Sequence, residues 1–298
     1  MAEITLLDGS IGQELVKRSG DKPTGLWSTK VMIDHPDLVR DVHTTYFETG
    51  ATVATANTYA VLRDRLRRVG IEEHFETLLS TAMSTAGAAR DAAGHGRVAA
   101  ALGPLNASYR PDIFPPADEA AEVYGEIVAH VKEAADIFLI ETVTSVEHAE
   151  GALRATDGQG KPVWLAMSTD DFDGTIFRSG EPLTDVAAGV ANHQVDAVLL
   201  NCSRPEVVAD GLEIIKTFAK PFGAYANGFT KISDGFKTEF PTVDTLTERT
   251  DLGPEPYADF AMGWVGQGAS IVGGCCEVGP AHIAELARQL RDAGHIIV

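Results

Sequence analysis

The chain has 298 residues, 44% of them hydrophobic, which suffices to bury the core of one large domain or of two ordinary domains. Its 43 acidic and 24 basic side chains give a formal net charge of −19, which argues against nucleic acid or an anionic membrane as a partner. No secretory signal and no apolar run near the roughly twenty residues of a membrane span are found, so we expect a soluble cytoplasmic protein.

Short apolar runs rich in β-branched residues recur along the whole chain. Such runs are typical of parallel strands that are buried on both faces. The predicted strands are Ile4–Leu7, Thr52–Ala56, Val98–Leu102, Ile137–Ile140, Val163–Met167, Ala197–Leu200, Phe222–Tyr225 and Ser270–Val272.

Longer amphipathic stretches separate these runs. Leu38, Val39, Val42 and Tyr46 form one apolar stripe at helical spacing. Proline, acidic or hydroxyl residues occupy the expected first turns. These predicted helix starts are His35-Pro36-Asp37, Pro116-Ala117-Asp118, Thr144-Ser145, Arg204-Pro205-Glu206, Glu255-Pro256 and Gly279-Pro280.

Eight such strand–helix units in one chain predict a single (β/α)8 TIM barrel. An open doubly wound sheet would show the same alternation. However, no Gly-x-Gly-x-x-Gly follows the first strand, where Asp8-Gly9-Ser10-Ile11-Gly12 stands instead. Because no change in composition divides the chain, residues 1–298 are expected to form one domain.

In a barrel, the residues that end the strands meet at one mouth, where active sites lie. Strands six and eight are only one strand apart, so Cys202 is expected to meet the Cys275-Cys276 pair there. The strand-end residues are Asp8, Asn57, Gly103, Glu141, Ser168, Asn201, Cys202, Asn227, Cys275 and Cys276.

The three cysteines, Cys202, Cys275 and Cys276, therefore predict a zinc site at the C-terminal ends of the strands. Three protein ligands leave the fourth position of a tetrahedral zinc ion open, as in catalytic sites. Gly273-Gly274 gives the backbone freedom for the sharp turn that neighbouring ligands require. The resulting anionic site would bind and activate a substrate thiol.

The three cysteines also allow other interpretations. Buried free cysteines often act only as small hydrophobic residues. A disulfide network is disfavoured, because the cysteine count is odd and the composition is that of a cytosolic protein. An exposed pair could also oxidise as damage or regulation.

The sequence resembles the zinc-dependent homocysteine S-methyltransferases nearly from end to end. That family carries Asn-Cys after strand six and Gly-Gly-Cys-Cys after strand eight, as at Asn201-Cys202 and Gly273-Gly274-Cys275-Cys276. Further matching segments are Leu6-Leu7-Asp8-Gly9-Ser10, Leu26-Trp27-Ser28, His35-Pro36-Asp37-Leu38-Val39, Thr55-Ala56-Asn57-Thr58-Tyr59, Ser108-Tyr109-Arg110-Pro111-Asp112 and Glu141-Thr142 with Glu147.

The resemblance implies catalytic zinc on Cys202, Cys275 and Cys276, with homocysteine sulfur at the open position. It also implies that Asp8 and Glu141 bind the substrate ammonium. The N–H groups of Gly9 and Ser10 could receive a carboxylate. Asn227 stands where the family often has Pro-Asn after strand seven, and it is expected to bind substrate, as is Trp27. Turn or cap formation by Asp8 and an ion pair between Glu141 and an arginine are the structural alternatives.

The implied reaction is in-line transfer of a methyl group to homocysteine, giving methionine. Trp27 lies in a segment that resembles members using S-methylmethionine, which is the preferred donor. Aromatic faces for a cationic donor are expected from Trp27, Tyr59, Tyr109 and Phe172. Betaine remains open, as does methylfolate through a separate corrinoid partner protein.

Two segments depart from the family. Glu277 places a carboxylate beside the zinc site, where it either points to solvent or favours a cationic donor. Residues 227–253 form a long polar connection, expected to be a lid or an oligomer contact. The oligomeric state itself is not indicated.

Two other functions are kept as alternatives. A zinc hydrolase would hold water at the fourth position, but none of the nine histidines ends a strand, and an all-sulfur set makes a poor Lewis acid. The second alternative is a non-catalytic barrel that binds zinc or an amino acid.

Overall fold

The chain, seen in a computed structural model that describes residues 1–22, 24–238 and 245–298, folds around one parallel sheet. The strand order is β2-β3-β4-β5-β6-β7-β8-β1-β9. The strands are β1 (Glu3–Leu6), β2 (Val53–Ala56), β3 (Arg97–Leu102), β4 (Ile137–Val143), β5 (Val163–Met167), β6 (Ala197–Asn201), β7 (Phe222–Tyr225), β8 (Ile271–Val272) and β9 (Ile296–Ile297).

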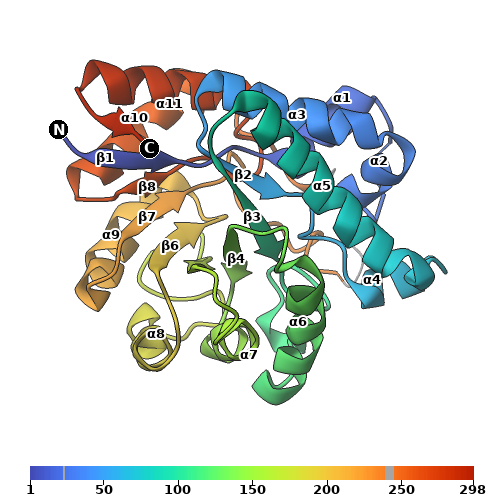
Figure 1. The fold of residues 1–298 in the computed structure, drawn as a ribbon. Helices are drawn as coiled ribbons and strands as arrows, with labels where there is room; N and C mark the ends of the chain where they lie inside the picture. The colour runs from blue at the N-terminus through green and yellow to red at the C-terminus, as the bar shows by residue number, and fades with distance from the viewer. Residues whose placement is uncertain (23, 239–244) are drawn as a thin grey trace.

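The sheet curls around a common centre, with the helices on its outside (Figure 1). The α-helices are α1 (Ile11–Ser19), α2 (Ser28–Asp34), α3 (Pro36–Thr49), α4 (Arg63–Arg68), α5 (Phe75–Ala93), α6 (Ala117–Val131), α7 (Val146–Thr156), α8 (Ala187–Asn192), α9 (Pro205–Ile215), α10 (Pro254–Gly266) and α11 (Pro280–Asp292). Short 3-10 turns are η1 (Glu72–His74), η2 (Pro111–Ile113), η3 (Leu183–Val186) and η4 (Lys216–Phe218).

β1 and β2 contact each other outside the strand pairs of the sheet. Within the described residues their contact is an isolated parallel bridge between Leu7 and Val53 rather than a strand ladder. The N–H of Thr52 donates to the Leu6 carbonyl at 2.7 Å, and the N–H of Asp8 donates to the Val53 carbonyl at 3.1 Å. The predicted α/β class is therefore confirmed, in the form of a curled parallel sheet in which β2 and β9 are the outermost strands.

The strands bury both faces, as their continuous apolar sequences predict. In β4, Ile137 and Leu139 point to a small inner cluster, whereas Phe138 and Ile140 join the larger core beneath the helices. This alternation follows from the two-residue period of a strand. The inner cluster fills the centre of the sheet with side chains.

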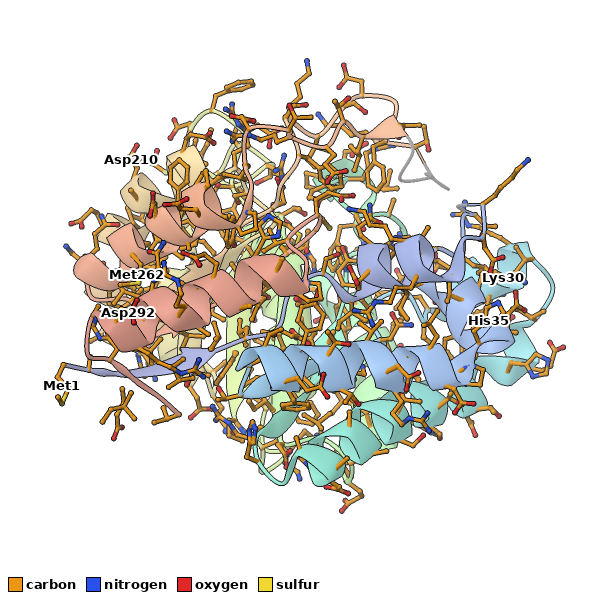
Figure 2. The ribbon with its side chains drawn as sticks, turned by 90° about the horizontal axis from the view of Figure 1, so that it is seen from above. Met1, Lys30, His35, Asp210, Met262 and Asp292 are labelled. Carbon is orange, nitrogen blue, oxygen red and sulfur yellow. A yellow bond between two sulfur atoms is a disulfide. The ribbon has the colours of Figure 1, made fainter. Side chains whose placement is uncertain are left out.

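The eight predicted strands are present with small changes in their bounds, and the predicted helix starts are confirmed except that α10 begins at Pro254. Ser145 caps α7 by accepting a hydrogen bond from the His148 N–H. β9 was not predicted from the sequence; it pairs with β1 and brings the chain ends together. In Figure 2, Met1 and Asp292 lie on one side of the molecule, far from Lys30 and His35.

Among the described residues, no helix is both long and apolar enough to cross a membrane. Three helices that the sequence analysis did not predict, α1, α2 and α4, follow β1 and β2. Residues at or near the starts of these helices line the mouth of the sheet.

Candidate active site

A pocket opens at the C-terminal ends of the strands. Its wall combines the three cysteines, two carboxylates, an arginine and several aromatic rings. The lining residues that matter below are Asp8, Gly9, Ser10, Gly12, Trp27, Tyr59, Arg65, Tyr109, Glu141, Cys202, Tyr225, Phe229, Phe236, Leu246, Cys275 and Cys276. These side chains meet at the C-terminal ends of the strands, where the sequence predicts the site.

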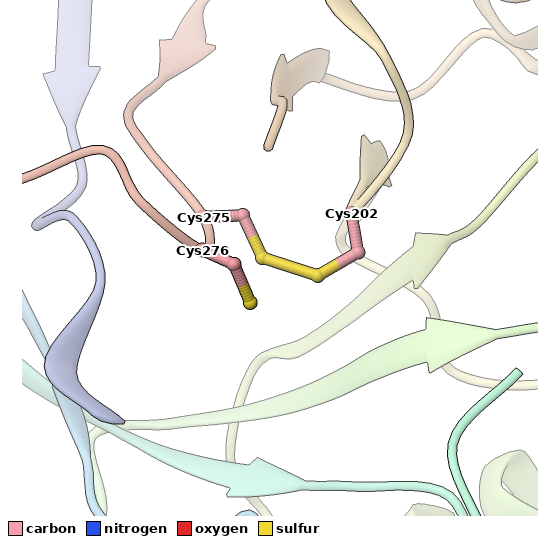
Figure 3. A group of neighbouring side chains, drawn as sticks. All are labelled: Cys202, Cys275 and Cys276. Carbon is pink, nitrogen blue, oxygen red and sulfur yellow. A yellow bond between two sulfur atoms is a disulfide. The ribbon is translucent and has the colours of Figure 1, made fainter. Parts of the chain in front are cut away.

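The three cysteine sulfurs converge in this pocket (Figure 3). Cys202 directly follows β6, and Cys275 and Cys276 follow the two glycines after β8. Their sulfur atoms all lie within 4.8 Å of one another. One metal ion can be reached by all three sulfurs. This is expected because β6 and β8 are separated by only one strand, β7.

Cys202 and Cys275 are joined by a disulfide, with their Cα atoms 5.7 Å apart, and Cys276 is free. The expectation that a disulfide is disfavoured is therefore wrong for this pair. Sequence counting could not reveal it, because two thiols brought together for a metal are also close enough to oxidise. A metal needs thiolate ligands, so this disulfide must be reduced before all three sulfurs can bind one ion.

Gly273 and Gly274 are required by close packing rather than by an unusual backbone angle. A Cβ on Gly273 would lie 2.4 Å from the Leu7 Cβ, and one on Gly274 would lie 2.2 Å from Val278 Cγ1. Neither glycine has a positive φ. Cys202 itself turns the backbone, with φ of 49°.

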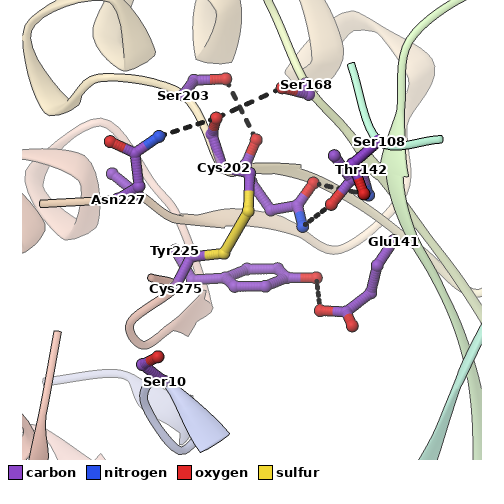
Figure 4. The surroundings of a disulfide bond; sticks show 12 residues. Ser10, Ser108, Glu141, Thr142, Ser168, Cys202, Ser203, Tyr225, Asn227 and Cys275 are labelled. Atoms are coloured by element: carbon purple, nitrogen blue, oxygen red, sulfur yellow. Dashed lines mark hydrogen bonds between the residues drawn. A yellow bond between two sulfur atoms is a disulfide. The ribbon is translucent and has the colours of Figure 1, made fainter. Parts of the chain in front are cut away.

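The Cys202 carbonyl is held by three side chains, and Figure 4 shows two of them, Asn227 and Ser168. It accepts hydrogen bonds from Asn227 Nδ2 at 2.9 Å, Arg178 Nη2 at 3.2 Å and Ser168 Oγ at 3.3 Å. Arg178 is fixed in turn by an ion pair with Asp171 at 2.8 Å. Since a left-handed φ is unfavourable for cysteine, these donors hold Cys202 in a conformation that it would otherwise leave.

Asp8 and Glu141 are both buried in the pocket. Asp8 accepts from the Thr55 N–H at 2.6 Å and from Thr55 Oγ1 at 2.8 Å. Glu141 accepts from the Tyr225 hydroxyl at 2.8 Å, and no ion pair joins it to a described arginine. Burial raises the pKa of Asp8 to about 7 and that of Glu141 to about 8.

The turn after β1 is more fully occupied than predicted. The Ser10 N–H donates to the Val278 carbonyl at 2.9 Å, and Ser10 Oγ caps α1 by accepting from the Gln13 N–H. The Ser10 amide is therefore not available to a carboxylate in this conformation. Gly9 packs tightly against Tyr46 and the same Val278 carbonyl.

Trp27 forms part of the pocket wall. Its indole N–H donates to Gln13 Oε1 at 2.7 Å, and its ring meets Tyr59 edge-on at 6.0 Å between centroids. Tyr109 also lines the pocket. Phe172 does not, since it is 72% exposed, so its predicted place in a donor site is wrong.

Glu277 does not point to solvent. It accepts from Gln13 Nε2 at 2.6 Å and forms an ion pair with Lys17, and its side chain is 6% exposed. The carboxylate charge beside the cysteines is thus paired with a lysine on α1. Gln13, which binds both Glu277 and the Trp27 indole, links the segment after the cysteine pair to Trp27.

The connection over residues 227–253 contributes Phe229, Phe236 and Leu246 to the pocket. The Ile232 N–H donates to Asp171 at 2.8 Å, which fastens the connection beside Arg178. Residues 239–244 of this connection lie outside the described residues. The expected lid or oligomer contact stays a prediction.

Unusual backbone angles concentrate at this site. Seven described non-glycine residues have positive φ, and five of them line the pocket or flank it: Trp27, Tyr109, Thr142, Cys202 and Glu277. Such conformations persist where the surroundings enforce them, most often at functional sites.

A model of the homocysteine S-methyltransferase family matches residues 5–290. The chain belongs to the homocysteine S-methyltransferase family. The family resemblance inferred from the cysteine motifs is thereby confirmed, and the protein is an enzyme of the methyltransferase class.

Proteins similar to this methyltransferase match nearly all of its length. It is 26% identical to homocysteine S-methyltransferase YbgG of Bacillus subtilis, over 97% of this chain and 95% of that protein. It is 26% identical to the selenocysteine Se-methyltransferase of Brassica oleracea var. italica, covering 96% and 88%. The metallated crystal form of the Escherichia coli homocysteine methyltransferase MmuM superposes with a TM-score of 0.79 at 27% identity, covering 96% of each chain.

Several residues of the methyltransferase site escaped the sequence analysis. Tyr225 is the last residue of a predicted strand, a position that could have drawn attention to it. Thr55 lies one residue before the end of its predicted strand. Arg178 sits in a polar loop without a motif. Arg65 was hidden among the other arginines of α4.

Proposed function

We propose that the enzyme transfers a methyl group from S-methylmethionine to the sulfur of homocysteine, giving methionine. The observation that carries this proposal is the convergence of three cysteine sulfurs within 4.8 Å, in a pocket that also holds two buried carboxylates. Membership of the homocysteine S-methyltransferase family supports the same acceptor.

Zinc suits the donor set of this pocket. Cys202, Cys275 and Cys276 would hold the ion once the disulfide is reduced, and three soft sulfur ligands leave one position for a substrate thiol. Bound zinc would act as a Lewis acid that lowers the pKa of that thiol. Burial raises the pKa of the Cys276 thiol to about 12, so a nearby cation is needed to favour its thiolate.

Asp8 and Glu141 are proposed to bind the ammonium group of homocysteine. Both are buried, and their raised pKa values show how unfavourable an uncompensated charge is there. A substrate ammonium would supply the missing positive charge and favour ionised carboxylates. Thr55 and Tyr225 fix the orientation of these two acids before substrate arrives.

Asn227 is proposed to act on Cys202 rather than on substrate. Its amide nitrogen donates to the Cys202 carbonyl, and its amide oxygen accepts from the Phe229 N–H at 3.0 Å. Gly9 is kept as a backbone contact for substrate, while Ser10 is reassigned to capping α1.

Trp27, Tyr59 and Tyr109 are proposed to face the donor, because aromatic rings attract a sulfonium or quaternary ammonium centre. During transfer, the bond between the donor sulfur and the methyl carbon breaks, and its electron pair stays on the donor as a neutral thioether. A new carbon–sulfur bond forms to homocysteine, whose thiol proton has passed to solvent. The pocket must align these three atoms and exclude water.

Residues 1–298 are proposed to be one domain, with the bridge between Leu7 and Val53 marking the seam of a closed (β/α)8 barrel. The need for three reduced cysteines favours a reducing compartment such as the cytoplasm. Betaine, or methylfolate through a corrinoid protein, are alternative donors.

The test uses purified, reduced and zinc-loaded protein with homocysteine and, separately, S-methylmethionine, betaine or methylfolate. Methionine formed only with S-methylmethionine supports the proposed donor. Methionine from another donor keeps the methyltransferase and changes the donor. No methionine from any donor, with zinc retained, would favour a binding protein.

A further inference from the structure

Arg65 is a buried arginine in the wall of the active-site pocket. It lies on α4, a helix that follows β2, and only 8% of its surface is exposed. Its side chain lines the same pocket as the cysteines, Asp8 and Glu141. Its guanidinium group therefore brings a positive charge into the wall of the pocket.

No hydrogen bond or ion pair joins the Arg65 side chain to any of the residues that the structure describes. Two other arginines of α4 are paired at the surface: Arg63 with Glu126, and Arg67 with Glu72 at 2.7 Å. Burying a charge without a partner is costly, and proteins rarely tolerate it without a function. The most buried of these three arginines is thus the one that has no protein partner.

Arg65 and Tyr59 both line the pocket. Burial raises the pKa of the Tyr59 hydroxyl to about 12, and the charge of Arg65 partly opposes that rise. Asp8 and Glu141 are held instead by Thr55 and Tyr225. The pocket therefore has an acidic part suited to an ammonium and a separate basic part suited to an anion.

We propose that Arg65 binds the carboxylate group of a substrate and thereby selects amino-acid substrates that carry one. The proposal rests on the proposed function, under which homocysteine and S-methylmethionine both enter this pocket with a carboxylate. A planar guanidinium can bind both oxygens of a carboxylate at once. The Ser10 amide, which could have served instead, already donates to Val278.

Binding of the product tests this assignment without turnover. L-methionine and L-methioninamide share the ammonium and the thioether, but the amide has no carboxylate. By calorimetry, Arg65→Gln is expected to weaken methionine binding about 10- to 100-fold. Methioninamide binding should change by no more than about twofold. Equal losses for both ligands, or no loss for either, would overturn the proposal.

Arg67→Gln is the matched control, because Arg67 lies on the same helix with 66% of its side chain exposed and outside the pocket. It should leave both affinities unchanged. Arg65→Lys keeps the charge but loses the two-pronged contact, so an intermediate loss is expected.

Paired substrates identify which carboxylate Arg65 binds. For the acceptor, homocysteine is compared with 3-aminopropane-1-thiol; for the donor, S-methylmethionine is compared with (3-aminopropyl)dimethylsulfonium. In Arg65→Gln, a KM that rises only for homocysteine assigns the acceptor carboxylate, and one that rises only for S-methylmethionine assigns the donor. A rise for the carboxylate-free compounds as well would contradict the proposal.

Thermal unfolding separates binding from a structural role. Arg65→Met removes an unpaired buried charge, so the Tm of the ligand-free protein should rise by about 2 °C or more. A fall in Tm would show that Arg65 supports the fold. If wild-type protein forms no methionine from any donor, the proposed function fails, while the comparison of methionine with methioninamide still decides the role of Arg65.

Discussion

The Tyr225 hydroxyl donates a 2.8 Å hydrogen bond to the Glu141 carboxyl group, and both side chains are buried at the mouth of the sheet. They come from different strands, β7 and β4, which lie three places apart in the sheet order. The contact therefore crosses the pocket and fixes the acid that is proposed to bind the substrate ammonium (Figure 4).

Replacing Glu141 by Gln should raise the KM for homocysteine about 10- to 100-fold, because a charged hydrogen-bond acceptor is lost. Tyr225→Phe keeps the acid but frees its orientation, and a smaller rise is expected. Steady-state kinetics measure both. An unchanged KM for homocysteine in Glu141→Gln would refute the role of this acid.

Binding of methionine near pH 7 should release protons. Burial raises the pKa of Asp8 to about 7 and that of Glu141 to about 8, so both carry protons in part of the free enzyme. A substrate ammonium favours the ionised acids and lowers their pKa values, so affinity should increase with pH up to about 8. Calorimetry in buffers of different ionisation enthalpy measures this release, and heats independent of the buffer would contradict it.

The same shifts predict how the ligand-free protein responds to pH. An acid whose pKa is raised on folding stabilises the native state least when it is ionised, so stability should be lost as pH rises from about 4 to about 8. In Glu141→Gln that loss should be smaller. Urea unfolding at pH 5 and at pH 8 measures it; equal slopes for both proteins would argue against a raised pKa.

The three donors on the Cys202 carbonyl should matter for metal retention. Asn227→Ala removes the shortest of these hydrogen bonds, at 2.9 Å, and leaves Cys202 less restrained in its left-handed conformation. We expect zinc affinity to fall about 10- to 100-fold, as for other residues that orient metal ligands. Competition with a chelator measures the affinity. Asn192→Ala, at the end of α8, is a control that should have no effect.

His43 provides a prediction about stability at low pH. It is fully buried in α3, and neither ring nitrogen has a hydrogen-bond partner among the described residues. Burial lowers its pKa from 6.5 to about 4, so the stability present above pH 6.5 is lost as pH falls toward 4. His43→Leu should raise the free energy of unfolding by about 1 kcal/mol at pH 7 and by more at pH 5.

Unfolding in urea at both pH values measures this effect, with His74→Leu as the control, since the His74 side chain is 58% exposed. The control should change stability little at either pH. If His43→Leu lost its advantage at pH 5, protonation of His43 could not be the cause of acid sensitivity.

The parts of the fold that depend on local sequence were predictable. Strands such as Val163–Met167 are continuous apolar runs, and their ends locate Cys202 and Glu141 without any knowledge of contacts. The two-residue strand β9 was missed, because it is too short to show a pattern and exists only through its pairing with β1.

The partners of the site residues were not predictable, because they come from distant segments. Asn227 was expected near substrate, but its side chain reaches the Cys202 carbonyl. The Ser10 amide was expected to be free, but Val278 approaches it after the cysteine turn. Hydrogen-bonding capacity is a property of a residue type, whereas its use depends on which groups the fold brings within reach.

Zinc analysis of the fully reduced protein tests most directly whether Cys202, Cys275 and Cys276 share one ion. Wild-type protein should retain one zinc per chain after dialysis, and Cys276→Ala should lose most of it and all methyl transfer while remaining folded by circular dichroism. Reduced wild-type protein without zinc, or a folded Cys276→Ala variant that keeps both zinc and activity, would contradict the proposed site.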